Sequence, residues 1–491
     1  MITKIEQIPI TELNYPFASA ERYCDLSSKG YEESEYYMYG TANVYQTADE
    51  DGGAEIKTSD APYINRFIVR KPKKAEECSG NVVIEIINPT SFMEIDRMWI
   101  LGHKEFLRNG DIYIGITSKP NTIAKLVDFN QERYERLSWK NPTPEMQFPF
   151  DVEEILKDTG ILPDIDISYE TGLFWDMLTD LAWLIRSEDE KNPLVNYVRN
   201  FLCLTGWSQS ACYLYRYVNS FAYRPEIAKG ACVFDCYLAG GGIRSLVVPV
   251  SQYESRRKYS RKLHYIEKIS QPFISVQTES ENGRYDGCRT RSDDSDRIDF
   301  KHRLYEVTGA SHDTMFSYVN YYKKDPDLIR IKHLPEYAGK HEQGNDYPSH
   351  ILFSAAFRNL FSWVRSGTAP NRCQRILVNG DGENCKDAFG NTIGGLRTCL
   401  LNYPTGRYFN TSNVDPGMNA IDPASDKDGL FGYQEAFSEA MIRELYTSLA
   451  NYRDLVTKDT QEQVSKGYIC REDAEELIEL AVSLAGKRGL K

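Results

Sequence analysis

The stretch Phe201-Leu-Cys-Leu-Thr-Gly-Trp-Ser-Gln-Ser-Ala211 decides our interpretation of this chain. Its first residues form a short, mainly apolar run, which is typical of a strand buried on both faces of a parallel sheet. A tight Gly-Trp-Ser-Gln-Ser turn and an apolar helical pattern follow. The order strand, sharp turn, helix puts a serine at the edge of a sheet with its hydroxyl exposed. Ser208 is therefore predicted to be a nucleophile.

The turn has the form G-x-S-x-S, with Gly206 and Ser210 two positions before and after Ser208. Small residues are normal at these positions because backbone and helix approach closely there, and the usual form is G-x-S-x-G. Serine is small enough to make Ser210 a mild departure. The pattern alone is common by chance, so the strand before it and the helix after it carry the prediction.

A serine hydroxyl needs a base to take its proton, and His312 is the predicted base. It follows a predicted strand at Arg303–Val307 and lies in the small-residue loop Gly309-Ala-Ser-His312. A loop histidine that only makes structural hydrogen bonds is the alternative. Four other histidines have charged or proline-containing surroundings and are predicted to be exposed: His302, His333, His341 and His350.

The acid that orients the imidazole should follow the predicted strand Pro272–Gln277. Thr278-Glu-Ser-Glu281 comes next and offers two carboxylates. The usual spacing after such a strand favours Glu281, and Glu279 would then shape the turn. Three further carboxylates fall in a polar loop and are weaker candidates: Asp293, Asp294 and Asp296.

An oxyanion intermediate needs hydrogen-bond donors. One is predicted to be the backbone N–H of Gln209, directly after the nucleophile. The other is predicted in the loop Asn88-Pro-Thr-Ser91, which follows an early strand. Pro89 has no N–H, so Thr90 or Ser91 is the expected donor, unless this loop is merely a turn.

The element pattern around these motifs predicts the α/β class. A strand at 81–87, a helix at Trp99–Arg108 and a second strand at Asp111–Thr117 form a β–loop–α–β unit. Further strands are predicted at Gly230–Phe234, Pro272–Gln277 and Arg303–Val307. The sequence thus indicates a central, mostly parallel sheet flanked by helices.

The domain organisation follows from the same pattern. Residues 1–75 are predicted to form a β-rich segment of short strands, among them 36–45 and 63–70, packed on the core. The core is expected at 76–335, with a lid insertion at about 119–170 and a second excursion at about 239–268. Residues 336–491 form a C-terminal extension with helices at 351–364 and 472–484. The lid aromatics either line a pocket or pack on the core: Phe129, Tyr134, Trp139, Phe148 and Phe150.

Composition restricts the possible partners. The net charge of −13 argues against nucleic acid, because phosphate binding needs a basic surface. No apolar run approaches the ~20 residues that span a bilayer. The N-terminus lacks the features of a signal peptide, so we expect a cytoplasmic protein.

Metal and cofactor sites are not predicted. The eleven cysteines contain no C-x-x-C pair, and the chain has no H-E-x-x-H, P-loop or strand-linked G-x-G-x-x-G motif. Gly240-Gly-Gly242 is interpreted as a loop beside the active-site face rather than as a nucleotide site.

Taken together, these motifs resemble the alpha/beta hydrolase domain family of bacterial proteins over nearly the whole chain. The pieces that carry the resemblance are 35–45, 61–63 with Arg66, 83–88, 206–211, 278–279, 306–312, Trp363, 367–370, 390–391 and 394–397. The resemblance implies the α/β-hydrolase fold, an esterase-like activity, the triad positions given above and a C-terminal region integral to the fold. The family has Thr-Glu-x-Asp at the acid turn, where this chain has Glu281, so Glu279 stays open as the acid.

The function predicted first is a serine hydrolase that cleaves a carboxylic ester through an acyl-enzyme, with a small-molecule ester as substrate. An acyltransferase using the same acyl-enzyme is one alternative. A non-catalytic protein that binds a small molecule in the hydrolase pocket is another, although the intact Ser208 and His312 weigh against it. The sequence names neither the ester nor the oligomeric state.

Overall fold

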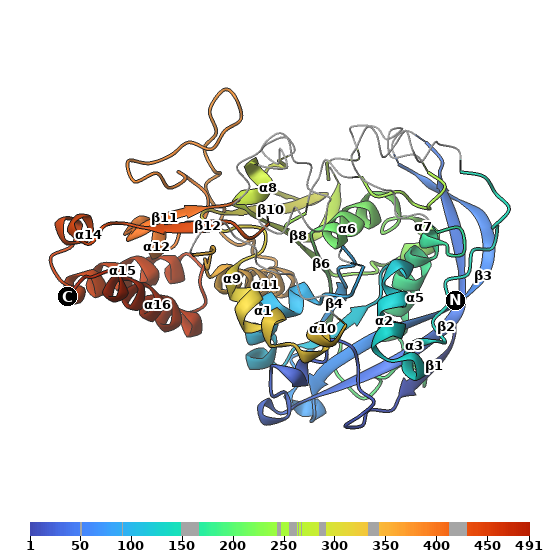
Figure 1. Cartoon of the computed structure of the whole chain (residues 1–491). Coiled ribbons are helices and arrows are strands. Elements are labelled where there is room, and N and C mark those ends of the chain that lie inside the picture. Colours follow the sequence, from blue (N-terminus) through green and yellow to red (C-terminus); the bar gives the residue numbers. More distant parts are fainter. Residues whose placement is uncertain are drawn as a thin grey trace.

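The computed structural model describes residues 1–49, 52–90, 92–148, 166–242, 247–254, 263, 265–266, 268–283, 291–331, 343–411 and 430–491. Within these residues, the main feature is a ten-stranded sheet with the strand order β1-β2-β3-β5-β4-β6-β7-β8-β10-β9. Figure 1 shows the N-terminal strands at one end of the molecule and the C-terminal helices at the other.

Six neighbouring strands at the centre of the sheet run parallel. They are β5 (Ile112–Ile116), β4 (Asn81–Ile86), β6 (Phe201–Trp207), β7 (Cys236–Gly240), β8 (Ile269–Thr278) and β10 (Phe300–Val307). Every residue of β4 and β5 is buried, as expected for strands covered by helices on both faces. The predicted mostly parallel α/β sheet is confirmed.

The N-terminal strands extend this sheet in antiparallel fashion. They are β1 (Ile2–Ile8), β2 (Tyr31–Thr47) and β3 (Ala54–Pro72), while the short β9 (Ser295–Arg297) closes the other edge. The prediction of short strands is wrong, because β2 and β3 form one long hairpin. A polar stretch at 57–60 interrupts the apolar pattern without ending the strand. Pro62 is tolerated because β3 pairs with β5 only at 67–70.

One parallel strand was placed six residues too early by the sequence. We predicted a strand at Gly230–Phe234, whereas β7 begins at Cys236. Val233 and Phe234 are buried in the connection that leads into the strand. Apolar residues in a buried connection give the same signal as a strand, which explains the error.

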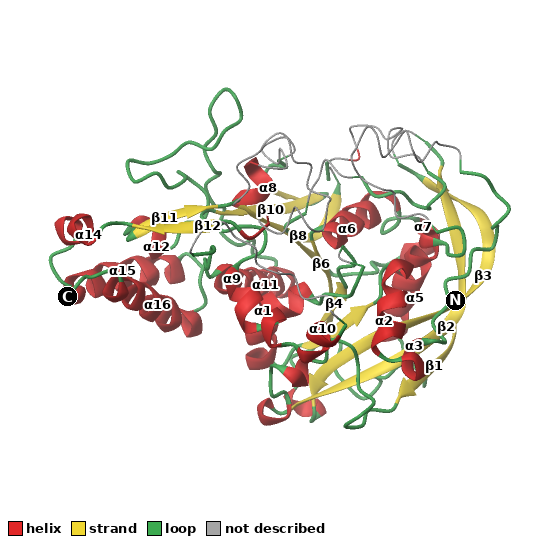
Figure 2. Ribbon diagram, viewed as in Figure 1, coloured by secondary structure: helices red, strands yellow, loops and turns green. Residues whose placement is uncertain are grey.

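Helices cover both faces of the sheet (Figure 2). On one face lie α5 (Phe174–Arg186) and α6 (Gln209–Ser220), and on the other α1 (Arg97–Asn109) and α11 (Ser349–Ser366). Strand β4 divides its side chains between the faces: Val82 and Ile84 join the apolar cluster under α5 and α6, and Val83 joins the cluster under α1 and α11. This alternation is the two-residue period of a strand.

The remaining helices are short or belong to the C-terminal extension. The short ones are α2 (Ile123–Phe129), α3 (Gln131–Tyr134), α7 (Pro225–Ala228), α8 (Glu279–Gly283), α9 (Met315–Asn320), α10 (Pro326–Arg330) and α12 (Cys399–Asn402). The C-terminal extension contains α14 (Glu439–Leu445), α15 (Leu449–Ser465), α16 (Ala474–Lys487) and the hairpin β11 (Gly406–Phe409) and β12 (Tyr433–Ala436).

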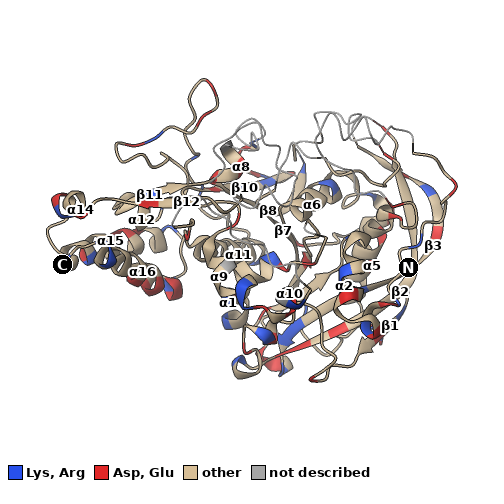
Figure 3. Cartoon of the chain, viewed as in Figure 1, with Lys and Arg blue, Asp and Glu red and all other residues tan. Residues whose placement is uncertain are grey.

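The C-terminal helices share the apolar cluster of α1 and α11. Leu477 and Ile478 of α16 are buried in it together with Phe357 of α11. An ion pair reinforces the contact, because Arg108 at the end of α1 donates to both carboxylate oxygens of Asp473. Basic and acidic residues are intermixed along α15, whereas α16 begins with glutamates and ends at Lys487 (Figure 3). Among the helices described, none combines the length and apolarity needed to cross a bilayer.

The lid aromatics mostly pack into the protein. Tyr134 and Trp139 are fully buried and Phe129 is 6% exposed, all within the cluster under α5 and α6. Phe148 stacks on Tyr253 with ring centroids 5.1 Å apart. Phe150 and residues 149–165 lie outside the described part, as do parts of the second excursion.

Candidate active site

Ser208 lies at the junction between β6 and α6 with φ 56° and ψ −117°. A non-glycine residue at positive φ is strained and persists only where its surroundings hold it. Two hydrogen bonds do so: the Ser208 N–H donates to the Gly240 carbonyl (2.9 Å), and the Asn88 side-chain amide donates to the Trp207 carbonyl (2.7 Å). The residue is half-buried. The predicted strand–turn–helix arrangement is therefore present.

Gly206 and Ser210 meet beneath the turn. A Cβ on Gly206 would lie 2.8 Å from the backbone carbon and oxygen of Ser210, which is closer than such atoms pack. Ser210 itself is fully buried, and its hydroxyl donates to the Ile87 carbonyl at 3.2 Å. Serine thus fits the position usually held by glycine and adds a bond to the end of β4.

Two glycines of the Gly240–Gly242 cluster, Gly240 and Gly241, make room for Trp207. A Cβ on Gly240 or Gly241 would lie 2.8–2.9 Å from the indole. The indole, in turn, lies beside the imidazole of His312, with ring centroids 5.0 Å apart. The glycine cluster therefore lets the residue next to the nucleophile contact the predicted base.

His312 and Glu281 contact each other directly. The distance from His312 Nδ1 to Glu281 Oε1 is 2.5 Å, and both side chains are buried. Glu281 Oε2 accepts the N–H of Thr278 at 2.5 Å, and the His312 N–H donates to Ser280 Oγ at 2.9 Å. A carboxylate at Nδ1 favours the tautomer with its proton on Nδ1, which leaves Nε2 able to accept a proton.

The other predicted carboxylates bind elsewhere. Glu279 accepts the N–H of Gly309 (2.8 Å) and the hydroxyl of Thr392 (2.6 Å). Asp294 accepts the N–H of Leu304, Asp296 pairs with Arg303, and the Asp293 carbonyl faces His302. Of the candidate acids, Glu281 is the one that the structure brings to His312.

The loop after β4 is tied to the nucleophile turn, but Thr90 is engaged within it. The Thr90 N–H donates to the Asn88 side-chain oxygen at 2.9 Å, so this amide is occupied. Ser91 lies outside the described residues. Gln209 is the first residue of α6, and its N–H belongs to the first turn, whose amides have no partner within the helix.

Sequence reasoning missed Arg97. This side chain is 1% exposed, pairs with Asp313 (2.9 Å) and donates to the His312 carbonyl at 3.5 Å. Its guanidinium also lies over the Trp207 ring, 5.2 Å from the ring centroid. Arg97 thus contacts the segments that carry both the nucleophile and the base. An arginine at the start of an amphipathic helix has the pattern of a solvated residue, so the sequence offered no signal.

Two histidines predicted to be exposed are buried, which corrects that prediction. His302 stacks on Phe300 with ring centroids 5.6 Å apart and makes a 3.1 Å contact with Ser275 Oγ. His350 stacks on Phe316 with centroids 3.6 Å apart, and burial lowers its pKa. Neighbouring charges on the chain gave a misleading impression of exposure. His333 and His341 lie outside the described residues.

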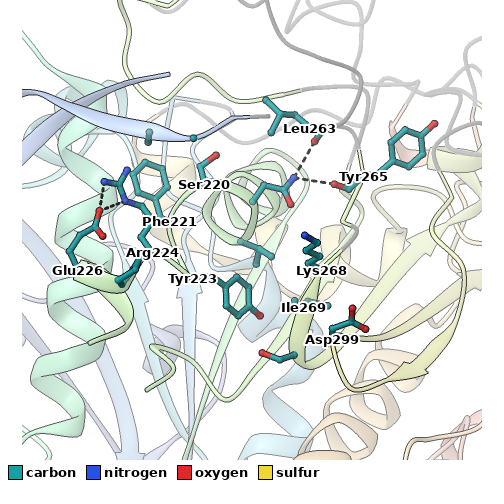
Figure 4. Close-up of a pocket in the computed structure, with 16 residues that line it drawn as sticks. Ser220, Phe221, Tyr223, Arg224, Glu226, Leu263, Tyr265, Lys268, Ile269 and Asp299 are labelled. Carbon is teal, nitrogen blue, oxygen red and sulfur yellow. Dashed lines mark hydrogen bonds and ion pairs between the residues drawn. The ribbon is translucent and has the colours of Figure 1, made fainter. Parts of the chain in front are cut away.

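A cavity of about 910 Å³ lies away from these residues. It is lined by the end of α6, including Ser220 and Phe221, and by Lys268 and Asp299 (Figure 4). Ser208 precedes the first residue of α6, roughly 18 Å away along the helix at 1.5 Å per residue. This cavity is therefore separate from the candidate active site.

Comparison with known proteins identifies the family of the chain. Residues 5–479 match the model of the alpha/beta hydrolase domain family. Solved structures that match the chain include an alpha-beta serine hydrolase homologue from Coxiella burnetii (10% identity, 55% of this chain and 92% of that one, TM-score 0.27). A Pyrobaculum calidifontis esterase is 11% identical over 64% of this chain and 88% of that one, with a TM-score of 0.29. Esterase Est22 is 12% identical over 65% of this chain and 81% of that one, with a TM-score of 0.32. None of the curated proteins matches the chain. The chain belongs to the alpha/beta hydrolase domain family.

Proposed function

We propose that this protein is a serine hydrolase that cleaves a carboxylic ester, with Ser208 as nucleophile, His312 as base and Glu281 as acid. The observation that carries the proposal is the 2.5 Å contact between His312 and Glu281 beside the strained Ser208 turn. All three residues follow the carboxyl ends of parallel strands, where sites in such sheets form. Trp207, the residue before Ser208, lies beside the His312 ring with ring centroids 5.0 Å apart, which supports the grouping.

The first half of the reaction forms an acyl-enzyme. His312 Nε2 takes the proton of the Ser208 hydroxyl while the serine oxygen attacks the ester carbonyl carbon. Glu281 stabilises the imidazolium that results, and the Gln209 N–H donates to the oxyanion at the positive end of α6. The bond to the alcohol oxygen then breaks, and His312 gives its proton to the departing alcohol.

The second half releases the acid. His312 takes a proton from water, the resulting hydroxide attacks the acyl carbon, and the collapsing intermediate expels the Ser208 oxygen, which regains its proton from His312. The second oxyanion donor stays a prediction for the loop after β4, with Ser91 favoured because the Thr90 N–H is occupied.

The first test is turnover of p-nitrophenyl and aryl esters by the wild type and by Ser208→Ala. We expect hydrolysis by the wild type and a loss of about 10⁶-fold in kcat in the variant, the size seen when a serine nucleophile is removed. A fluorophosphonate probe should label the wild type at Ser208 alone.

Two results would contradict the proposal. Equal hydrolysis by wild type and Ser208→Ala would place the chemistry elsewhere. No turnover together with no labelling of Ser208 would mean that the triad is not assembled, and a binding function would then be preferred. Adding an alcohol acceptor to the active enzyme and analysing the products separates hydrolysis from acyl transfer.

A further inference from the structure

Glu279 is a buried carboxylate that the proposed reaction does not use. It is 1% exposed and lies two residues before Glu281 at the start of α8. Burying a carboxylate is costly unless it is hydrogen-bonded or paired. Its partners should therefore show why the fold keeps it there.

These partners come from two distant parts of the chain. One carboxylate oxygen accepts the N–H of Gly309, in the loop that carries His312 (2.8 Å). The other accepts the Thr392 hydroxyl (2.6 Å) and lies 3.3 Å from the ammonium of Lys386. Glu279 therefore joins the base loop to the C-terminal extension.

Residues of the C-terminal extension hold both loops at further points. The Ser280 hydroxyl donates to the Asn410 carbonyl (2.7 Å), and the Asn410 amide donates to the Glu279 carbonyl (2.9 Å). The Ser311 hydroxyl, next to His312, donates to the Phe431 carbonyl at 2.6 Å. We call Thr392, Lys386, Asn410 and Phe431 the C-terminal clamp.

Gly395 and Leu396 of the C-terminal extension lie directly against the end of β10. The Thr308 N–H donates to the Leu396 carbonyl (3.1 Å), and the Leu396 N–H donates to the Glu306 carbonyl (2.7 Å), so the segment pairs with the end of β10. Gly395 has φ +71°, and a Cβ there would lie 2.2 Å from the Thr308 hydroxyl. Glycine is thus required at a point where the C-terminal extension touches the strand that leads to His312.

We infer that Glu279 is a positioning residue, through which the C-terminal clamp sets the place of His312 relative to Glu281. This inference rests on the proposed function. The Glu279 carboxylate makes hydrogen bonds to Gly309 and Thr392 and none to the His312 or Glu281 side chain. It therefore acts through Gly309 and Thr392 rather than on the substrate. Loosening the clamp should slow the chemical step and leave substrate binding unchanged.

The test compares Glu279→Gln and Thr392→Val with the wild type in ester turnover. Thr392→Val removes the hydroxyl bond at constant volume, and Thr392→Ser restores it. We expect kcat to fall roughly ten- to hundred-fold in Glu279→Gln, the size that small misplacements of catalytic groups produce. The fall in kcat should be smaller in Thr392→Val, and Thr392→Ser should recover the wild-type kcat. The KM of all three variants should stay within about two-fold of the wild-type value.

A control variant and a second measurement distinguish a positioning role of Glu279 from a purely structural one. Thr405→Val removes a buried hydroxyl that accepts from Arg488 at 2.8 Å, in the same extension but outside the C-terminal clamp. This control should keep the wild-type kcat even if its stability falls. Hydrogen exchange should become faster in peptides covering 303–315 for Thr392→Val but not for Thr405→Val.

Failure of this inference differs from failure of the proposed function. Activity that survives Ser208→Ala, or its complete absence from the wild type, sinks the hydrolase assignment and this inference with it. With Ser208-dependent turnover established, the inference alone is overturned if Thr392→Val keeps the wild-type kcat, if KM changes instead of kcat, or if exchange at 303–315 is unaltered. If Glu279→Gln fails to fold, the comparison of Thr392→Val with Thr392→Ser still tests the inference.

Discussion

At the scale of single residues, the candidate site depends on close packing around a strained serine. The positive φ of Ser208 is compatible with the fold because Gly206 leaves space for the backbone of Ser210. The site also depends on which of two neighbouring glutamates faces the imidazole. Both features give predictions that a single substitution can test.

Gly206→Ala should disturb the turn. Its Cβ would lie 2.8 Å from the Ser210 backbone, which has no room to move within the first turn of α6. Overpacking of this kind costs about 1–3 kcal/mol of unfolding free energy, and kcat should fall because Ser208 shifts. Urea unfolding and ester turnover measure both effects. Gly380→Ala is the matched control because its Cβ would meet no atom within 4 Å, and equal effects in the two variants would refute the explanation.

Glu281→Gln should lower kcat more than Glu279→Gln. Loss of the carboxylate that holds the base in its correct tautomer costs ~10⁴-fold in a comparable triad, whereas Glu279 acts at one remove. KM should change little in either variant. Steady-state kinetics of the two proteins decide the matter, and a greater loss in Glu279→Gln would reverse the assignment of the acid.

At the scale of elements, most of the sequence predictions about the core are confirmed. Strands β4, β5 and β10 and helices α1 and α11 all occur where the sequence predicted them. The errors occurred where apolar residues belong to a connection, as at Val233 and Phe234, or where a strand contains a polar stretch, as in β3. Strand order and spacing favoured Glu281 as the partner of His312 but left Glu279 open, and the structure shows the contact with Glu281. Arg97 was not predicted, because burial of a charge depends on tertiary packing that no local pattern encodes.

Helix α1 also carries a pH-dependent element. His103 is buried against Trp99, and burial lowers its pKa to about 4 from the ordinary 6.5. Between pH 6.5 and 4 the unfolded chain therefore binds a proton that the folded protein does not, so stability falls as the pH falls through this window. At ~1.4 kcal/mol per pH unit, His103 should account for a loss of about 3 kcal/mol.

Urea unfolding at several pH values between 4 and 7.5 measures this loss. His103→Gln removes the titrating group and keeps a polar side chain of similar size. The variant should be less stable than the wild type near neutral pH, with a pH dependence smaller by about 3 kcal/mol over the window. If the unfolding free energies of the two proteins change in parallel with pH, His103 is not the cause of the loss of stability.

At the scale of the whole molecule, helices α11 and α16 of the C-terminal extension share one apolar cluster with α1. The sequence predicted helices α11 and α16 but not α14 and α15, and the family resemblance implied that the extension is integral. What the sequence could not supply was the set of contacts from Thr392, Asn410 and Phe431 to the acid and base loops. These contacts join residues 113 to 131 positions apart, and pairing at such separation leaves no periodic trace in a single sequence.

Leu477→Ala should therefore destabilise the entire chain rather than α16 alone. Leu477 is fully buried, and truncating a buried leucine costs about 2–5 kcal/mol. We expect one unfolding transition at lower urea concentration, followed together by tryptophan fluorescence and ester turnover. The exposed Ser483→Ala should change stability by no more than about 0.5 kcal/mol. Separate transitions for the two probes would mean that α16 unfolds independently.

The contacts that the C-terminal extension makes with the acid and base loops have a consequence for the order in which a new chain becomes active. Synthesis runs from the N-terminus, so Ser208, Glu281 and His312 all leave the ribosome before Thr392, Asn410 and Phe431. A nascent chain that has already produced its nucleophile still lacks the residues that hold its base in place. The proposed hydrolytic activity should accordingly begin only when translation is nearly finished, and prematurely terminated products should be inert toward esters.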